Sequence, residues 1–303
     1  MIHMINSARK INMDSPHFSR RQFAFLAGTA LASTRAKAAE ITGRQVIERI
    51  QKNVGVPWRT ETVDTFKAGN PDSAVKGIAT SFSATLDVMQ RGVASGKNLF
   101  IVHEPTFYNH QDSTKDLADD PVYIAKQAYI DKNGLMVWRF HDHWHARRPD
   151  GIFTGMTEAL GWEKFLSPDN RRLFVMPTTT LQQLAKDIRS KLNIRTMRVM
   201  GDPQLKVSRV GMSPGFGDAR GVMRTIERPD LDVLIIGESR EWEGVEYMRD
   251  ALTLGQKKGL LILGHVPSEE SGMKECAKWL KTFVPEVPIE FIPSGEPFWT
   301  PTA

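Results

Sequence analysis

The sequence predicts an α/β fold, because short apolar runs alternate along the chain with stretches that repeat at helical spacing. Three largely apolar runs have the length of a strand, namely residues 99–102 (LFIV), 135–140 (LMVWRF) and 260–264 (LLILG). Residues 207–212 and 232–236 have the same character. Strands that are apolar on both faces are typical of a buried, largely parallel sheet covered by helices. We therefore expect an α/β architecture with largely buried sheet.

The connecting stretches carry helix signals. Residues 42–53 place Val46, Ile47 and Ile50 on one face, and residues 84–95 form a second predicted helix. Thr180 is suited to cap a third helix, in which apolar residues recur from 181 to 192. Residues 167–170 are rich in proline, asparagine and aspartate, which indicates a junction. The predicted lobes are therefore residues 39–166 and 167–303.

Residues 1–38 have the anatomy of an export signal. Arg20 and Arg21 precede an apolar run at residues 23–32, and the pattern Ala36-Lys37-Ala38 offers a cleavage site. The Ser-Arg-Arg-Gln-Phe start resembles the twin-arginine motif. An uncleaved membrane anchor is the alternative, but the run is far below the roughly 20 apolar residues that span a bilayer. We expect a periplasmic protein without stable membrane insertion after cleavage.

The basic charge of the chain does not indicate a nucleic-acid partner. Residues 1–38 contain six of the 40 basic residues and one of the 35 acidic residues, so cleavage leaves 34 of each. The single cysteine, Cys276, rules out an intramolecular disulfide and a metal site built from several thiolates. Its neighbours form an amphipathic pattern, which predicts a buried small side chain and not a nucleophile.

Histidines gather where the predicted strands end. Beyond residue 38 there are six, and five of them follow directly on the three runs: His103, His141, His143, His145 and His265. The carboxyl ends of parallel strands converge on one crevice, where α/β proteins bind their ligands. Glu104, Asp142 and Glu269 accompany the histidines. Mixed imidazole and carboxylate sets suit zinc, iron, manganese or nickel. One histidine alone at a strand end is more often structural, so the grouping carries the prediction.

The stretch FHDHWHA, residues 140–146, can serve one site only if it turns. In an extended strand His141 and His145 would lie about 13 Å apart, too far to share an ion. In a helix the rise between them falls to roughly 6 Å, and they share a face. We therefore expect the strand to end near Phe140 and His143 to point elsewhere.

Two later segments have structural explanations beside functional ones. Gly264 permits a tight turn, and Ser268 stands where it can cap a helix that starts near Glu269. A carboxylate in a first helical turn also interacts favourably with the helix dipole, so Glu269 or Glu270 need have no other role. The glycine-rich residues 211–221 could cradle a phosphate, but they lack a complete motif and better suit a strand-to-helix turn.

The motifs HEP, FHDHWH and GHVPSE together resemble the Ngg-interacting-factor-three-like family of dinuclear metal proteins, some of which were once assigned as type-two GTP cyclohydrolase I. The resemblance spans roughly residues 41–293. It implies two α/β lobes around a metal-binding cleft, two divalent metal ions and commonly a hexameric ring. Carried over by position, the metal ligands are His103, Glu104, His141, His145, His265 and Glu269.

Two of these positions depart from the family pattern. Glu104 stands where a second histidine is usual, and His145 stands where an aspartate is usual. The exchange conserves the number of ligands and their formal charge, which supports a working two-metal centre, although one metal being lost or replaced is the alternative. The family's aspartate before the first helix is also missing, with Ser83 nearby.

The resemblance implies a metal-dependent hydrolase of unknown substrate, in which a water bridging two ions attacks the substrate and Glu269 bridges the ions. Glu238 and His143 are the candidates for a general acid or base, and Glu238 could equally be only a helix-start carboxylate. The alternatives are a protein that stores or delivers metal and a scaffold that metals hold together. A catalytic site keeps an open coordination position, whereas a structural site is closed.

Overall fold

The computed structural model describes residues 40–301, so the predicted export signal at residues 1–38 lies outside the described part. The described residues from 41 onward form one unit of the chain. Within the described residues, no helix has the length and apolar character needed to cross a membrane.

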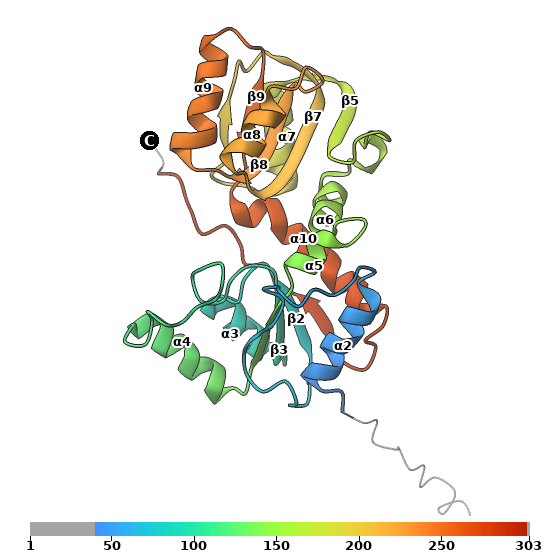
Figure 1. Ribbon diagram of the computed structural model, residues 1–303, viewed down its shortest axis with the longest axis vertical. Coiled ribbons are helices and arrows are strands. Elements are labelled where there is room, and N and C mark those ends of the chain that lie inside the picture. Colours follow the sequence, from blue (N-terminus) through green and yellow to red (C-terminus); the bar gives the residue numbers. More distant parts are fainter. Residues whose placement is uncertain (1–39, 302–303) are drawn as a thin grey trace, which may run out of the picture. The chain divides into compact units, whose positions relative to one another are not determined.

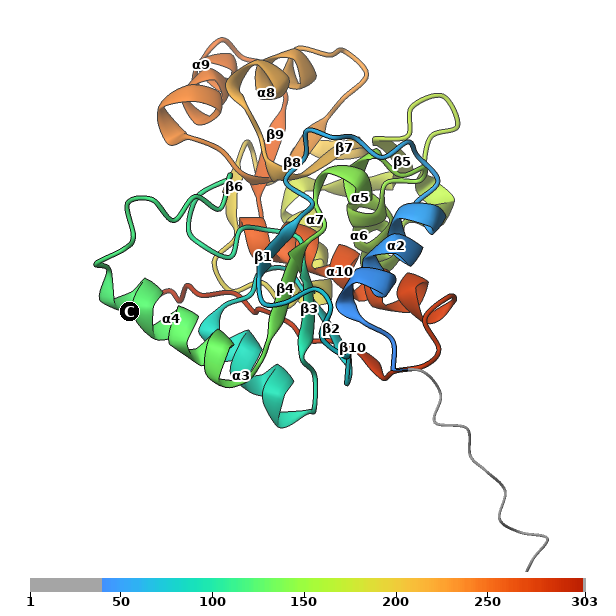
Figure 2. The same cartoon turned by 60° about the horizontal axis from the view of Figure 1, so that its bottom comes forward.

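The first sheet, which contains the strands labelled β2 and β3 in Figure 1, has the strand order β1-β4-β3-β2-β10, and Figure 2 labels all five strands. Its strands are β1 (Phe66–Ala68), β2 (Ile78–Ser81), β3 (Leu99–Val102), β4 (Met136–Arg139) and β10 (Ile289–Phe291). All neighbours pair in parallel except β1, which is antiparallel to β4. Every residue of β2, β3 and β4 is buried. This is the pattern that a parallel sheet covered on both faces requires.

Helices cover both faces of the first sheet. Side chains of α2 (Gly43–Asn53) and α10 (His265–Lys281) share one apolar core with it. Those of α3 (Leu86–Ala94) and α4 (Pro121–Lys132) share another. Thr42 caps α2 through its side chain, which accepts the N–H of Gln45. The predicted helices at 42–53 and 84–95 are therefore confirmed to within two residues.

The second sheet has the order β5-β7-β8-β9-β6. Its strands are β5 (Leu173–Thr180), β6 (Arg198–Met200), β7 (Lys206–Phe216), β8 (Val233–Glu238) and β9 (Gly259–Ile262). The three central strands are parallel, and β5 and β6 are antiparallel edges. Helices α6 (Gly151–Leu160) and α7 (Leu181–Lys191) pack with one core, α8 (Ala219–Ile226) and α9 (Glu246–Thr253) with another. Thr180 caps α7, as predicted.

Helix α10 joins the two sheets. It starts directly after β9, contacts β7 and β8 of the second sheet and β2 and β10 of the first, and packs closely on α6 (Figure 2). The crossing with α6 depends on glycine, since a Cβ at Gly155 would overlap the backbone of Ser271. Cys276 is fully buried in this helix, as expected for a small apolar side chain.

The α/β class is thus confirmed, with two five-stranded sheets in the described residues. The division into lobes at residue 167 stays a prediction. The chain returns to the first sheet near its end, because β10 pairs with β2. Short segments complete the connections: α5 (Asp142–Ala146), η1 (Glu163–Phe165) and the π-helical η2 (Glu241–Val245).

Candidate metal centre

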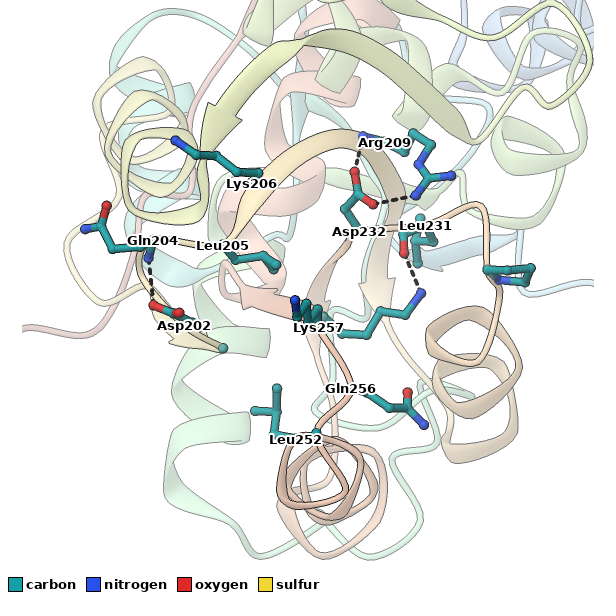
Figure 3. A pocket seen from close by; sticks show the side chains of 14 residues that line it. Asp202, Gln204, Leu205, Lys206, Arg209, Leu231, Asp232, Leu252, Gln256 and Lys257 are labelled. Atoms are coloured by element: carbon teal, nitrogen blue, oxygen red, sulfur yellow. Dashed lines mark hydrogen bonds and ion pairs between the residues drawn. The ribbon is translucent and has the colours of Figure 1, made fainter.

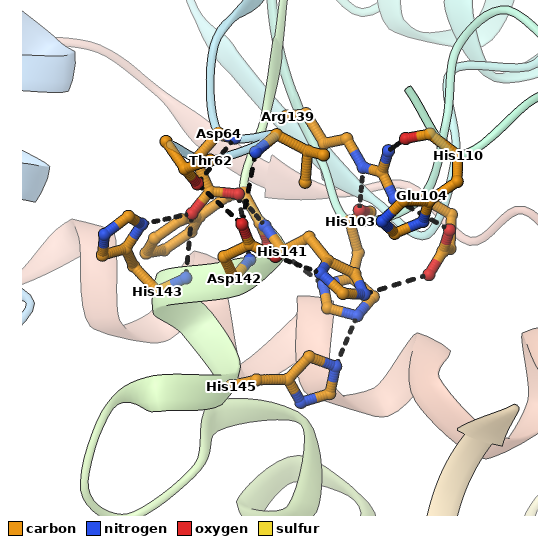
Figure 4. A network of polar contacts seen from close by, with 12 residues as sticks. Thr62, Asp64, His103, Glu104, His110, Arg139, His141, Asp142, His143 and His145 are labelled. Atoms are coloured by element: carbon orange, nitrogen blue, oxygen red, sulfur yellow. Dashed lines mark hydrogen bonds and ion pairs between the residues drawn. The ribbon is translucent and has the colours of Figure 1, made fainter. Parts of the chain in front are cut away.

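Three strand ends and two helices bring the candidate ligands together. His103 and Glu104 follow β3, His141 follows β4, and His145 lies in α5. His265 and Glu269 lie at the start of α10, directly after β9. Figure 4 shows His103, Glu104, His141 and His145 converging from the first sheet and α5. The carboxyl ends of strands from both sheets therefore contribute to one cluster.

The backbone turns where the histidine stretch requires it. Strand β4 ends at Arg139, α5 begins at Asp142, and the N–H of His145 donates to the carbonyl of His141 at 3.0 Å. The predicted change from strand to helix near Phe140 is confirmed. It places His141 and His145 on one side, with their ring centroids 4.9 Å apart.

Asp64 holds this turn, and the sequence alone gave no reason to select it. Its side chain is buried and accepts the N–H groups of His141 at 2.6 Å, Asp142 at 3.0 Å and His143 at 2.9 Å. A carboxylate that accepts several N–H groups at a helix start supplies the bonds that the first turn lacks. The sequence offers no signal beyond an acidic residue between Val63 and Thr65, far from the histidines.

The ligand atoms of the six side chains lie close enough to one another to share metal ions. Nε2 of His103 is 3.1 Å from Nε2 of His145 and 3.5 Å from Oε2 of Glu269. Nε2 of His265 is 3.2 Å from the same Oε2 and 3.6 Å from Oε1 of Glu104. That Oε1 is 3.5 Å from Nε2 of His141. Two overlapping groups could each hold a metal ion: His103 with His141 and His145, and His103 with Glu104 and Glu269.

Each of the four imidazoles is held at Nδ1 by an oxygen. Nδ1 of His103 lies 3.1 Å from the carbonyl of Phe140, and Nδ1 of His141 lies 3.0 Å from the carboxylate of Asp142. Nδ1 of His145 lies 3.2 Å from the carboxylate of Asp150, and Nδ1 of His265 lies 3.0 Å from that of Glu238. When Nδ1–H donates to such an oxygen, Nε2 is left with a lone pair. Metal-binding histidines are oriented in this way. The Nε2 atoms of all four rings therefore face the cluster.

Glu269 has an unpartnered oxygen at the centre of the cluster. Its side chain is 2% exposed, and Oε2 accepts no hydrogen bond within the described residues. A buried carboxylate oxygen without a partner is costly, and a cation would satisfy it. Gly215 in β7 passes so close that a Cβ there would overlap Oε1 of Glu269. These residues fit a metal ion.

Arg139 holds the second oxygen of Glu104. Its guanidinium is fully buried, and Nη2 donates to Oε2 of Glu104 at 3.2 Å, while Nε donates to the carbonyl of His103 at 3.0 Å. Oε1 of Glu104 therefore remains directed at His141 and His265. Burial and the neighbouring Glu269 carboxylate raise the pKa of Glu104 to about 7. Both oxygens of Glu104, the residue that replaces the family's usual histidine, therefore have defined neighbours: Arg139 at Oε2, and His141 and His265 at Oε1.

The cluster mixes groups whose pKa values are displaced in opposite directions. Burial lowers the pKa of His265, but the carboxylates of Glu238, Glu269 and Glu104 outweigh burial and raise it to about 10. Burial and the neighbouring imidazoles of His145 and His141 hold the pKa of His103 well below its usual value. Titratable groups displaced this far are typical of functional sites.

His143 lies apart from the cluster. It is fully buried, Nδ1 lies 2.7 Å from Asp64, Nε2 accepts the N–H of Arg59 at 3.0 Å, and the ring stacks on Trp58. Figure 4 shows it pointing away from His141 and His145, as expected from the helical turn. Both ring nitrogens of His143 are hydrogen-bonded to protein groups, which indicates a structural role for this side chain. The general acid or base role predicted for it has no support from this placement.

The structure also gives Glu238 and Ser268 contacts that differ from those expected. Glu238 does reach the cluster, but its carboxylate binds Nδ1 of His265, so it orients a ligand. Ser268 does not cap α10, since the helix starts four residues before Glu269, at His265. Its Oγ instead accepts the N–H of Gly215 at 3.0 Å, which ties β7 to α10. The helix starts early because Gly264, with φ of 95°, makes the turn alone.

The glycine-rich residues 211–221 are a strand-to-helix connection. Residues up to Phe216 belong to β7, and Asp218 caps α8 through its side chain. The phosphate-cradle alternative therefore has no support. The glycines in this stretch and in β8 allow the backbone to approach α10, since a Cβ at Gly237 would overlap Oγ of Ser268.

The end of the second sheet that lies away from the cluster has a pocket of its own. It has a volume of about 870 Å³ and is formed where β7, β8 and β9 begin (Figure 3). Arg209 binds Asp232 at 2.8 Å, and Nζ of Lys258 donates to backbone carbonyls, that of Leu231 among them. No histidine and no unpartnered buried side chain lines this pocket among the described residues.

The fold and the cluster define an α/β protein with a histidine and glutamate group that could hold a metal ion. The chain belongs to the Duf34/NIF3 (NGG1p interacting factor 3) family, whose model matches residues 44–297. The resemblance read from the motifs is therefore confirmed.

Solved structures share this fold. A Bacillus cereus protein related to NIF3 is 15% identical, with a TM-score of 0.70 over 86% of this chain and 99% of its own. The hypothetical protein SA1388 of Staphylococcus aureus is 17% identical, with a TM-score of 0.67 over 86% and 99%. A protein of unknown function, ybgI, is 18% identical, with a TM-score of 0.66 over 85% and 100%. No curated protein matches the chain.

Proposed function

We propose that the protein is a dinuclear metal-dependent hydrolase. The observation that carries the proposal is the convergence of four oriented imidazoles on the unpartnered oxygen of Glu269. The residues that would hold two divalent cations are His103, Glu104, His141, His145, His265 and Glu269. Zinc, iron, manganese and nickel all suit such a set.

Exposure of the cluster supports an enzyme over a closed structural site. The side chains of His141, His145 and His265 are 21%, 30% and 23% exposed. A structural site surrounds its metal with protein ligands, whereas a catalytic site leaves a position for water or substrate. Solvent can reach three of the four imidazoles from outside.

The chemistry divides between cations and protein. Bound divalent cations lower the pKa of water and polarise a carbonyl or phosphoryl group. The protein's own residues fix the ligands: Asp142, Asp150 and Glu238 orient imidazoles, and Arg139 orients Glu104. Glu238 is half exposed and next to the cluster, so it remains the candidate to hold a proton during hydrolysis.

Metal analysis followed by turnover measurements tests this function. We expect purified protein to contain about two equivalents of a divalent metal and to hydrolyse a member of a panel of phosphoesters, amides and nucleotides. Removal of metal with a chelator should abolish turnover, and adding it back should restore turnover. Tight metal binding with no turnover on the panel would favour the alternative of metal storage or delivery. Absence of metal would contradict the proposal.

We propose further that the chain is exported by its twin-arginine signal to the periplasm and assembles as a hexamer. The paired Arg20 and Arg21 before a modest apolar run support export. Export in the folded state suits a protein that acquires metal before crossing the membrane. A shift of the protein from periplasm to cytoplasm in an Arg20→Lys, Arg21→Lys variant tests export, and light scattering of the mature protein tests the hexamer.

A further inference from the structure

A pocket of about 710 Å³ opens beside the cluster, and two of its lining residues belong to the cluster or orient it. His265 and Glu238 form part of its wall, and the C-terminal residues 296–301 form another part. Its place at the carboxyl ends of β8 and β9 is the position at which α/β proteins bind their ligands.

The C-terminal segment is anchored at residues 294–296, where it enters the wall of the pocket. Glu296 accepts the N–H groups of Arg195 at 2.6 Å and Thr196 at 3.0 Å, and its side chain is 6% exposed. The N–H of Gly295 donates to Glu270 at 2.9 Å, and Oγ of Ser294 lies 3.0 Å from Oγ of Ser81. These bonds anchor the segment directly before Phe298 and Trp299.

This anchored segment presents two adjacent aromatic rings to solvent. Phe298 and Trp299 line the pocket and are 65% and 72% exposed. Two large aromatic side chains on an anchored segment, next to a candidate reaction centre, are not explained by core packing. Their faces and edges suit stacking on a flat ring.

The charges of the pocket leave one arginine for a ligand. Arg195 is bound by Glu296, and Glu238 is bound by His265. Arg198 forms its ion pair, among the described residues, with Glu241, which does not line the pocket, and both side chains of that pair are more than half exposed. An exposed pair of this kind is weak, so an anion in the pocket can compete for the guanidinium.

We propose that this pocket binds the substrate of the metal centre, and that the substrate is an anionic compound with a planar aromatic ring. Phe298 and Trp299 stack on the ring, and Arg198 binds the anionic group. The bond to be broken then lies on the side of His265. This inference rests on the proposed hydrolase function and names the substrate class for it.

Binding of two phosphate monoesters tests the proposal. The probes are 4-nitrophenyl phosphate, which carries a ring, and methyl phosphate, which does not. Isothermal titration calorimetry measures the affinity of each for the full metal-containing protein. Trp299→Ala should weaken binding of the aromatic ester about tenfold, equivalent to about 1.4 kcal/mol, and leave methyl phosphate unchanged. Phe298→Ala should act in the same direction.

Trp242 supplies a matched control. It is 74% exposed, lies in η2 and does not line the pocket, so Trp242→Ala should bind both esters like the wild type. Arg198→Gln should weaken both esters, since each carries the anion. Metal content of every variant is measured, and it should equal that of the wild type.

The outcomes separate this inference from the proposed function. Equal affinity of the Trp299→Ala variant and the wild type for the aromatic ester overturns the pocket assignment, as does absence of binding at millimolar ester. Hydrolysis that persists unchanged in Trp299→Ala would keep the hydrolase and reject the pocket. Binding that depends on Trp299 without any hydrolysis would keep the pocket and reject the hydrolase.

Discussion

The two ends of the second sheet carry charged side chains in opposite arrangements. Where β7, β8 and β9 begin, Arg209 is satisfied by Asp232, and Lys258 by backbone carbonyls. Where β8 and β9 end, His265 and Glu269 converge with side chains of the first sheet, and an oxygen of Glu269 has no hydrogen-bond partner. The first pocket is the larger, at about 870 Å³. Unmet bonding capacity, more than volume, therefore distinguishes the end of the sheet that carries the candidate metal centre.

The largest expected difference between the two ends is in metal binding. His265→Ala removes a candidate ligand whose side chain is 23% exposed, so the fold should survive. We expect metal affinity to fall by more than about 100-fold, beyond the 10–100-fold typical of losing a residue that only orients a ligand. Elemental analysis of the purified variant, with circular dichroism to verify folding, measures the change.

Lys257→Ala at the opposite end is the control for this variant. Lys257 lines the larger pocket, far along the strands from the cluster, so its removal should leave metal content unchanged. Full metal occupancy in the His265→Ala variant would refute the two-metal assignment of this residue. Equal loss in both variants would point to a global effect.

A smaller effect is expected at Glu238, which binds Nδ1 of His265 at 3.0 Å. In Glu238→Gln the amide oxygen still accepts the Nδ1–H, but the negative charge that strengthens the imidazole as a ligand is lost. We expect a fall in metal affinity of about tenfold, at the lower end of the range for such residues. Competition with a chromogenic chelator measures the affinity.

Glu241→Gln is the matched control, because Glu241 is exposed at 68%, lies near in sequence and binds Arg198 instead of a histidine. Its metal affinity should equal that of the wild type. If Glu238→Gln also equals the wild type, the carboxylate does not act through His265.

Sequence patterns predicted the parts of this site that depend on residues close together in the chain. Strand ends were marked by apolar runs followed by His103, His141 and His265, and the turn at Phe140 followed from the reach of His141 and His145. These are short-range constraints, fixed by backbone geometry. The grouping of the six side chains was carried by the resemblance of motifs, and the structure brings all six together.

What the sequence did not indicate depends on contacts between distant segments. Asp64 is 77 residues before His141, and nothing in its neighbourhood marks it as the residue that holds α5. Arg139 sits inside an apolar run and reads as part of a strand, although its buried guanidinium orients Glu104. The sequence predicted that His143 points away from the cluster, but not that its ring is buried against Asp64 and Trp58. Packing decides such cases.

A different kind of effect, on stability, is expected at Asp64. Asp64→Asn removes the charge of a fully buried side chain that accepts three backbone N–H groups and the Nδ1–H of His143. Hydrogen bonds to a charged group contribute about 1.5–3 kcal/mol, so we expect the free energy of unfolding to fall by about that amount. Urea unfolding followed by circular dichroism measures it.

The same variant tests whether metal binding depends on the position of α5, which directs His141 and His145 at the cluster. Metal affinity should fall together with stability, because Asp64 fixes the turn that directs His141 and His145 at the cluster. Asp72→Asn changes an exposed carboxylate paired with Arg44, and both stability and metal binding should be close to those of the wild type. A destabilised Asp64→Asn variant with unchanged metal affinity would show that the other elements hold the histidines in place.

The smallest effect is expected at the amino ends of the second sheet. Arg209→Gln breaks the pair with Asp232, but the arginine side chain is 43% exposed, and exposed pairs contribute about 0–1 kcal/mol. Asp232 keeps the N–H groups of Ser208 and Arg209 as donors, so the carboxylate does not lose all its partners. Stability should change by less than about 1 kcal/mol, with no change in metal content or hydrolysis. Loss of hydrolysis in this variant, with metal content intact, would mean that the larger pocket serves the reaction after all. Satisfied charges would then be no guide to which end of the sheet is functional.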